Sequence, residues 1–227
     1  MSKIILFGSG RGADVAYRFL TRDSDHQVCG FATEQAHLTH DWLHDLPVVA
    51  FETVEDRFPP DEYKFLVLLG YQRMNSLRAE KYLAVKSKGY DCISYVNSGF
   101  FRAEDLDVGE NCFILDNQSL SLDVKVGDNV VMWSSNHVGD LSRIGDHAWV
   151  SSHVTVAGEV DVGPRCFLGI GSTISNRLTL GEGTFVGANA LIATDTAKGS
   201  VHTAPAATAN DLDSKSFMRI MMGKGKL

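Results

Sequence analysis

The chain has 227 residues, 44% of them hydrophobic, and a net charge of −7. This length allows one large domain or two small ones with buried cores. Without a basic stripe there is no electrostatic footprint for nucleic acid, and no apolar run approaches the roughly 20 residues that cross a bilayer. The apolar run at the start of the chain is too short for a secretion signal. We therefore expect a cytoplasmic protein with neither a nucleic-acid nor a membrane partner.

The cysteines carry no metal-binding pattern. Cys29, Cys92, Cys112 and Cys166 form no CxxC pair, and each stands in an apolar stretch. Their spacings match no common zinc site. We expect four small buried hydrophobic residues and no bound metal.

The first hundred residues alternate between strand and helix patterns. An apolar run over residues 3–7 stops at a glycine-rich turn, and a helical pattern follows. Further strands are predicted over residues 27–32, 63–69 and 90–96, and a helix over residues 74–88. The run over 63–69 is fully apolar, which is typical of a central strand in a parallel sheet. The alternation predicts a small, doubly wound Rossmann-like α/β domain over residues 1–100.

Residues 101–227 follow a different period. Every sixth residue from Val108 to Ile192 is aliphatic or Met, without a slip. The residue four positions after each of these is small or apolar, except at Gln118 and Asn136. A six-residue unit cannot bury its aliphatic side chain alone, but units wound into a coil stack these side chains into one interior column. The second domain is therefore predicted to be a parallel β-helix, followed by a short amphipathic helix near residues 214–222.

Glycine often follows the repeated aliphatic residue, as at Gly145 and Gly163. This position suits a corner that needs either unusual backbone angles or a close approach between coils.

Several motifs together resemble one family. They are residues 5–13 (ILFGSGRGA), 69–78 (LGYQRMNSLR), 133–139 (WSSNHVG), 151–154 (SSHV) and 166–172 (CFLGIGS). The combination is similar to hexapeptide-repeat sugar acetyltransferases, which include sialic acid O-acetyltransferases and the N-acetyltransferases of UDP-bacillosamine and of dTDP- or GDP-linked 4-amino sugars. The resemblance covers nearly the whole chain. It implies a left-handed β-helix with three hexads per coil, and a homotrimer.

The glycine-rich turn is the predicted nucleotide site. Free backbone N–H groups at a helix N-terminus suit a pyrophosphate, so the phosphate candidates are Gly8, Ser9, Gly10 and Gly12. The resemblance adds Asn75 and Arg78 as nucleotide contacts. A dinucleotide enzyme is disfavoured, because Ala32 and Thr33 stand at the end of the second strand, with Glu34 just after, where such enzymes place an acidic residue.

Transfer of an acetyl group to an amine needs a base, and histidine serves near neutral pH. With coils of 18 residues, His153 lies above Ser135 and close to His137, with Asn136 as a substrate contact. The family's expected histidine is replaced by Asp140. Three hypotheses stay open: His137 or His153 is the base, Asp140 is the base or orients His137, or the subunit only positions its ligands.

The resemblance also implies a site for acetyl-CoA in a groove between subunits. Its predicted contacts are Gly169, Ile170, Gly171, Gly187 and Ala188. Aromatic residues in matching outward positions, Trp149, Phe167 and Phe185, would pack between subunits of the trimer.

The leading hypothesis is an acyl-CoA-dependent transferase that acetylates the amino group of a nucleotide-linked 4-amino-deoxysugar in surface polysaccharide synthesis. Two variants are O-acetylation of a sugar and transfer of a larger acyl group. A non-catalytic scaffold is a hypothesis of another class. A zinc enzyme of the γ-carbonic-anhydrase type would need three converging histidines, and His137, His147 and His153 have unsuitable spacings.

Overall fold

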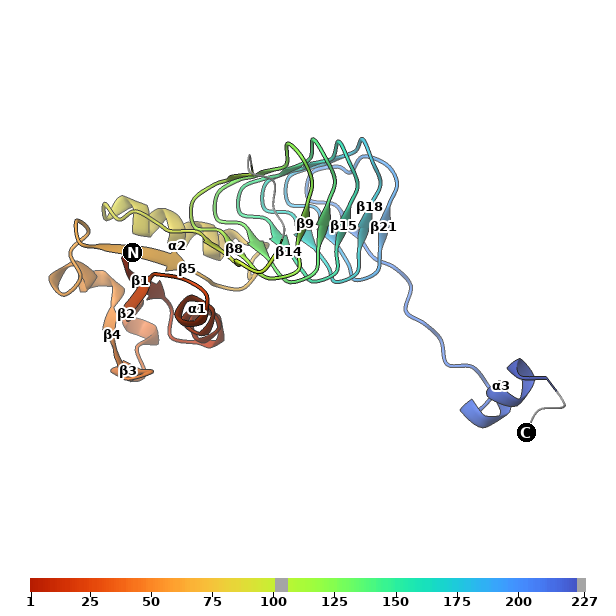
Figure 1. The fold of residues 1–227 in the computed structure, drawn as a ribbon, viewed down its shortest axis with the longest axis horizontal. Helices are drawn as coiled ribbons and strands as arrows, with labels where there is room; N and C mark the ends of the chain where they lie inside the picture. The colour runs from red at the N-terminus through yellow and green to blue at the C-terminus, as the bar shows by residue number, and fades with distance from the viewer. Residues whose placement is uncertain (101–105, 224–227) are drawn as a thin grey trace.

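The computed structural model describes residues 1–100 and 106–223. The first part of the chain folds around a five-stranded sheet with the order β3-β4-β2-β1-β5 (Figure 1). Only the β3–β4 pair is antiparallel among the pairs of this sheet in the described residues. Its elements are β1 (Lys3–Phe7), α1 (Arg11–Arg22), β2 (Gln27–Thr33), η1 (Gln35–His37), β3 (Trp42–Leu43), β4 (Leu46–Ala50), η2 (Phe51–Asp56), β5 (Tyr63–Val67) and α2 (Ser76–Ser87).

The side chains of β1 alternate between two cores. Ile4 and Leu6 pack with the α1 residue Leu20, whereas Ile5 and Phe7 pack on the opposite side, in the core that contains Val85 of α2. Because both faces of the strand are buried, β1 reads as a continuous apolar run. This arrangement confirms the predicted α/β domain.

Two predicted strands differ from the structure. The run over residues 63–69 was expected at the centre of the sheet, but β5 is the last strand in the sheet order and β2 is the middle one. The side chain of Asn111 binds the end of β5, since Oδ1 accepts from Val67 N at 2.7 Å and Nδ2 donates to Val67 O at 3.0 Å. In the predicted strand over 90–96, Cys92 forms a single parallel bridge with Phe65 of β5, whereas β6 (Tyr95–Val96) pairs with the β-helix.

The second part of the chain is a parallel β-helix of three sheets (Figure 1). The first sheet contains β7 (Asp107–Val108), β10 (Lys125–Val126), β13 (Arg143–Ile144), β16 (Asp161–Val162) and β19 (Thr179–Leu180). The second contains β6, β8 (Phe113–Ile114), β11 (Val131–Met132), β14 (Trp149–Val150), β17 (Phe167–Leu168), β20 (Phe185–Val186) and β22 (Val201–His202). The third contains β9 (Ser119–Leu120), β12 (His137–Val138), β15 (Thr155–Val156), β18 (Thr173–Ile174) and β21 (Leu191–Ile192).

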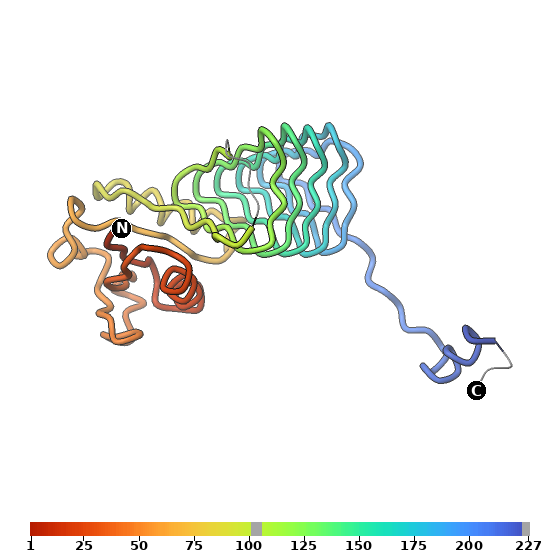
Figure 2. Tube along the Cα trace, in the orientation of Figure 1, coloured from red at the N-terminus to blue at the C-terminus, as the bar shows by residue number. Residues whose placement is uncertain are grey.

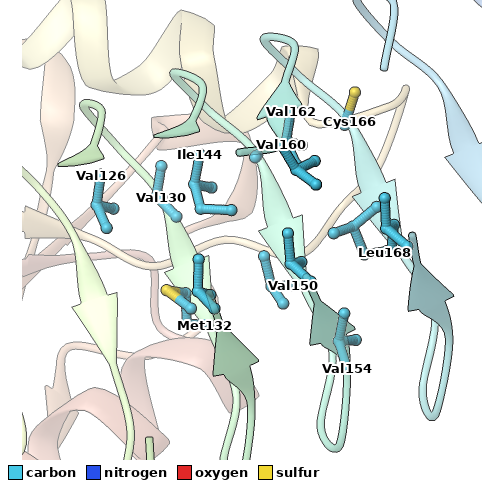
Figure 3. Packing of buried hydrophobic residues seen from close by; sticks show 14 of the residues in the cluster. Val126, Val130, Met132, Ile144, Val150, Val154, Val160, Val162, Cys166 and Leu168 are labelled. Atoms are coloured by element: carbon cyan, nitrogen blue, oxygen red, sulfur yellow. The ribbon is translucent and has the colours of Figure 1, made fainter. Parts of the chain in front are cut away.

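The repeated aliphatic side chains form the interior of the β-helix (Figure 3). Val126 pairs with Ile144, and Ile144 pairs with Val162, each one coil further along. Their exposed fractions are 3%, 0% and 0%. The predicted interior column is therefore confirmed, and its burial supplies the hydrophobic free energy that holds successive coils together.

The glycines after the aliphatic residues serve close approach and not unusual backbone angles. A Cβ atom on Gly145 would lie 2.6 Å from the carbonyl oxygen of Val162 in the next coil. The left-handed backbone angle occurs two residues later, at His147 (φ 62°) and Arg165 (φ 56°). The close approach between coils and the unusual backbone angle, which the sequence pattern allowed at the same glycine, therefore fall on two different residues of each corner.

Beyond the last coil, the chain leads away from the body to α3 (Ser214–Met221), which lies apart from both domains (Figure 2). Asp213 caps this helix by accepting a hydrogen bond from Ser216 N at 2.9 Å. The predicted C-terminal helix is confirmed. Across the described residues, no helix combines the length and the apolar character that crossing a bilayer requires.

Candidate functional site

Two cavities share the glycine-rich turn as part of their walls. The larger, of about 440 Å³, is lined by the turn, by Leu68–Gly70 after β5, and by Trp133 and Trp149 of the β-helix. The smaller, of about 260 Å³, is lined by Ser9, Thr33, Glu34 and Lys81, among others. Both cavities include Gly8 and Gly10 in their walls. The turn thus contributes to two cavities, and the larger one reaches the second domain.

Two glycines of this turn, Gly8 and Gly12, are each required for a different physical reason. Gly8 has a φ of +97°, which side-chain-bearing residues rarely adopt. Gly12 lets α1 approach β5, since a Cβ atom there would lie 2.3 Å from the carbonyl oxygen of Leu68. At Gly10 a Cβ atom would meet nothing within 4 Å. The backbone at Gly10 and the first turn of α1 therefore offers N–H groups to an anion in the cavity.

An ion pair missed by the sequence analysis lines the smaller cavity. Glu34 Oε1 accepts from Lys81 Nζ at 2.7 Å, and the two side chains are 36% and 19% exposed. Strand β2 extends to Thr33, one residue further than predicted, which puts Glu34 directly at its carboxyl end. Rossmann-type domains place the acidic residue that binds a ribose at this position. The signal was present in the sequence but fell outside the predicted strand.

The far wall of the larger cavity is aromatic. The ring centroids of Trp133 and Trp149 are 6.1 Å apart. Tyr71, from the loop after β5, lies 5.3 Å from Trp149 and 4.8 Å from Phe167. Trp149 and Phe167 are buried, at 7% and 9% exposed, by residues of the same chain. These two aromatic residues, predicted to pack between subunits, instead pack against the first domain, and Phe185 stacks on Phe167.

Asn75 and Arg78 lie outside both cavities. Both are 0% exposed, between α2 and the corners that join the first sheet of the β-helix to the second. Asn75 Nδ2 donates to Arg165 O at 3.1 Å, and Arg78 Nη2 donates to His147 O at 2.7 Å. Burial lowers the pKa of Arg78 to about 9. The predicted nucleotide contacts are not available to these side chains, which instead join the two domains.

A ladder of polar side chains lies under α2 at the same corners. Asn111 Nδ2 donates to Asn129 Oδ1 at 2.8 Å, and Asn129 Nδ2 lies 2.9 Å from His147 Nδ1. Because an amide nitrogen only donates, His147 Nδ1 is assigned as the acceptor and the imidazole is neutral. His147 is half-buried, and burial lowers its pKa.

The candidate bases lie at another edge of the β-helix, where the chain turns from the second sheet to the third. We call this the Trp133 edge; it consists of the stacked corners at residues 133–136, 151–154, 169–172 and 187–190. His153 N donates to Ser134 O at 3.2 Å, so the first two corners are adjacent. His137 follows the first corner, and both histidines are exposed. His137 Nδ1 lies 3.2 Å from Ser119 Oγ.

The residues predicted to bind acetyl-CoA lie on the Trp133 edge as well. The third and fourth corners contain Gly169, Ile170, Gly171, Gly187 and Ala188, and Asn189 N donates to Ile170 O at 2.9 Å. Ile170 is 53% exposed. One edge therefore brings together both histidines, these five residues and one tryptophan of the larger cavity.

Two other predicted residues are not brought into this group. Asp140 lies at the following corner, beyond β12, and among the described residues it has no hydrogen bond to His137. Asn136 is 2% exposed and points into the β-helix, where Oδ1 accepts from Val154 N at 2.8 Å and Nδ2 donates to Trp133 O. Gln118 also donates to Trp133 O, at 2.7 Å. The two polar exceptions in the repeat thus hold the corner that carries Trp133, and the predicted substrate contact by Asn136 is not available.

Within the described ranges, no three His, Cys, Asp or Glu side chains are grouped to hold a metal ion. His147 also lies on a different edge from His137 and His153, so these three do not form the set that a γ-carbonic-anhydrase-type site would need.

Solved structures share this architecture, although no protein-family model and no curated protein matches the chain. A histidine-to-asparagine mutant of perosamine N-acetyltransferase from Caulobacter crescentus, in complex with CoA and GDP-perosamine, has a TM-score of 0.81 at 22% identity, covering 93% of this chain and 98% of that chain. The acetyltransferase domain of PglB from Neisseria gonorrhoeae FA1090 has a TM-score of 0.78 at 15% identity, covering 90% and 97%. WeeI from Acinetobacter baumannii AYE has a TM-score of 0.73 at 18% identity, covering 88% of this chain and 96% of that chain. The chain has their fold.

This likeness extends over both domains, so the predicted combination of an α/β domain and a β-helix is confirmed. The PglB domain is also known in complex with acetyl coenzyme A. At 15–22% identity, the likeness concerns the fold and leaves the reaction to the chemistry of the site.

Proposed function

We propose that this protein is an acyl-CoA-dependent acyltransferase that acetylates the amino group of a nucleotide-linked 4-amino-deoxysugar. The observation that carries the proposal is the larger cavity, which has the glycine-rich turn at one end and Trp133 at the other. It connects a place for phosphates to the edge with two exposed histidines. The fold is shared with an enzyme whose structure contains CoA and GDP-perosamine.

The two cavities give the nucleotide sugar an orientation. Its diphosphate would lie over Gly8–Gly10, where backbone N–H groups and the α1 dipole favour negative charge. Its nucleoside would occupy the smaller cavity, where Glu34 accepts hydrogen bonds from hydroxyl or N–H groups and Lys81 holds Glu34 in place. Its sugar would then extend into the larger cavity toward the Trp133 edge.

Acetyl-CoA would lie along the Trp133 edge, past Gly169–Gly171 and Gly187–Ala188. The neutral amine nitrogen attacks the thioester carbonyl, the N–C bond forms and the C–S bond breaks. The base takes one proton from the amine nitrogen and passes it to the leaving thiolate, so that CoA departs as its thiol. His137 is the first candidate base, because its side chain is exposed and its Nδ1 lies within hydrogen-bond distance of Ser119 Oγ. His153 is the second. Asp140 would act in a neighbouring subunit of a trimer or not at all, because it lies at a different corner.

The proposal is tested by measuring thiol release from acetyl-CoA with purified protein and dTDP-, UDP- or GDP-linked 4-amino sugars. We expect release with at least one amino sugar and none with its 4-hydroxy counterpart. Release with the hydroxyl sugar alone would indicate O-acetylation. A protein that shows no binding heat with acetyl-CoA would be a scaffold, and the proposal would be wrong.

A further inference from the structure

We infer that α3 docks on a second copy of this chain, at the edge of the β-helix where the third sheet turns into the first. The contact surface there, which we call the Leu141 patch, consists of Leu122, Asp123, Asp140 and Leu141. The inference concerns an interaction surface. It does not depend on the proposed reaction, which assigns the candidate bases to the Trp133 edge.

The helix α3 lacks the contacts that usually stabilise so short a helix. It has eight residues, and none of them is buried. In the described part of the chain, its hydrogen bonds stay within residues 213–223, and it lies apart from both domains (Figure 2). Isolated helices shorter than roughly 12–15 residues are marginal in water. A stable α3 therefore needs a partner that covers it.

The surface of α3 is apolar on one side and basic on another. Phe217, Ile220 and Met221 recur at the spacing of one helix face, and they are 44%, 65% and 69% exposed. Lys215 and Arg219, four residues apart, share a different face. From residue 214 to residue 227 the sequence has four basic residues and no acidic one, although the whole chain has a net charge of −7. A matching surface would be both apolar and acidic.

The Leu141 patch has this composition. Leu122 and Leu141 are 66% and 60% exposed, and they lie in adjacent coils, since Leu141 N donates to Leu122 O at 3.0 Å. Asp123 and Asp140 add two exposed carboxylates at the same corners. Adjacent coils are about 4.8 Å apart. Two apolar side chains and two negative charges thus lie within the length of one short helix.

The backbone at Leu141 also points to a covering partner. Leu141 has a φ of 58°, and it is the one apolar residue among the described non-glycine residues of the β-helix with a positive φ. Polar residues such as Asn129 and Arg177 occupy the same corner position in other coils. This conformation is unfavourable for an aliphatic side chain, which cannot form the local hydrogen bonds that Asn or Asp can. Burial of Leu141 by a partner would offset that cost.

Charge favours a second copy over a lipid surface as the partner. A basic amphipathic helix also suits anionic lipids. However, residues 1–213 contain all 28 acidic residues of the chain and 17 of its 21 basic ones, so an anionic membrane would repel the body of the protein. The same body attracts α3 of another copy. The eleven residues from 203 to 213 can span up to about 36 Å, which lets α3 reach a neighbour.

Hydrogen exchange of the full chain, measured by mass spectrometry, tests the docking. The amides of a docked α3 should exchange at least roughly tenfold more slowly than those of an unfolded peptide. The tail variant, Lys215→Glu with Arg219→Glu, should lose this protection. The patch variant, Asp123→Lys with Asp140→Lys, should lose it as well, because like charges would then face each other.

Two controls accompany these variants. Arg22→Glu with Arg57→Glu changes the net charge as much as the tail variant does, at exposed positions of the first domain, and should leave α3 protected. The β-helix peptides that contain Ile144 and Val162 should stay protected in every variant, which shows that the fold is intact.

A mixture of the two variants separates a second copy from the same chain. The patch variant retains the native α3, and the tail variant retains the native Leu141 patch. When both are unfolded together and refolded, the native α3 finds a native patch only on the other chain, and its protection should return. Its peptide differs in mass from that of the tail variant, so its exchange can be followed separately.

Several results would overturn the inference. If protection does not return in the mixture, α3 docks on its own chain. If the patch variant keeps its protection, α3 docks elsewhere. If the unmodified chain shows no protection until vesicles containing phosphatidylglycerol are added, the partner is a lipid surface; if it shows none in either case, α3 does not dock. None of these results bears on acetyl transfer, which thiol release measures separately.

Discussion

Two edges of the β-helix have the same repeat and opposite surroundings. At the edge under α2, the corner residues Asn111 and Asn129 are 1% and 0% exposed. At the Trp133 edge, His153 occupies the equivalent left-handed corner position and is exposed. The backbone is alike, with φ near 56° at Asn129 and 58° at His153. The repeat thus sets the same backbone conformation at both edges. Contact with the first domain buries the corners under α2, whereas His153 at the Trp133 edge stays exposed.

The largest effect on activity should come from the Trp133 edge. If His137 or His153 is the base, its replacement by Ala lowers kcat by roughly 10²–10⁴-fold. Its exposed side chain contributes little to packing, so the free energy of unfolding should change by less than about 0.5 kcal/mol. Steady-state kinetics and urea unfolding of the two single variants test this. If both variants keep full activity, neither histidine is the base.

The covered edge should show the reverse behaviour. Arg78→Ala removes the donors that satisfy the carbonyls of Asn129, His147 and Ala148 in a buried place. We expect the free energy of unfolding to fall by about 3 kcal/mol. Arg73→Ala, whose side chain is 59% exposed in the preceding loop, is the matched control and should change it little. Equal stability of the two variants would show that Arg78 does not clamp the domains.

A smaller effect is expected from His147, at the edge under α2: it should make the free energy of unfolding depend on pH. Histidine in the unfolded chain titrates near 6.5, and burial holds the pKa of His147 below that in the folded chain. Above this pH neither state binds the proton, and His147 costs no stability. As the pH falls below it, the unfolded chain takes up the proton first, so stability falls with a slope that approaches about 1.4 kcal/mol per pH unit.

Urea unfolding between pH 5 and 8 measures this slope. His147→Gln should reduce it, because the amide oxygen still accepts from Asn129 and does not titrate. Leu83→Gln, a control at a non-titrating position of α2 that is 57% exposed, should leave the slope as it is. A slope unchanged by His147→Gln would mean that other groups, such as the partly buried His26 with its lowered pKa, cause the acid sensitivity.

Much of the fold was predictable because the signals are local. The six-residue period identified interior residues such as Ile144 and Val162, since each aliphatic side chain follows from its place within its own coil. The glycine-rich turn was equally predictable, as Gly8 and Gly12 meet demands set by the adjoining strand and helix. The candidate site was predictable only in part: the histidines and the turn were identified, whereas Glu34, Lys81 and the tryptophan wall were not assigned to it.

The sequence by itself determined which side chains face the inside of the coil and where the chain turns tightly, because both depend on neighbours a few residues away. Only the tertiary structure decided that Arg78 binds His147, 69 residues away, that Trp149 faces the first domain, and that Asn136 points inward. These contacts depend on how α2 and the loop after β5 rest on the β-helix, and such docking leaves no periodic trace in either partner.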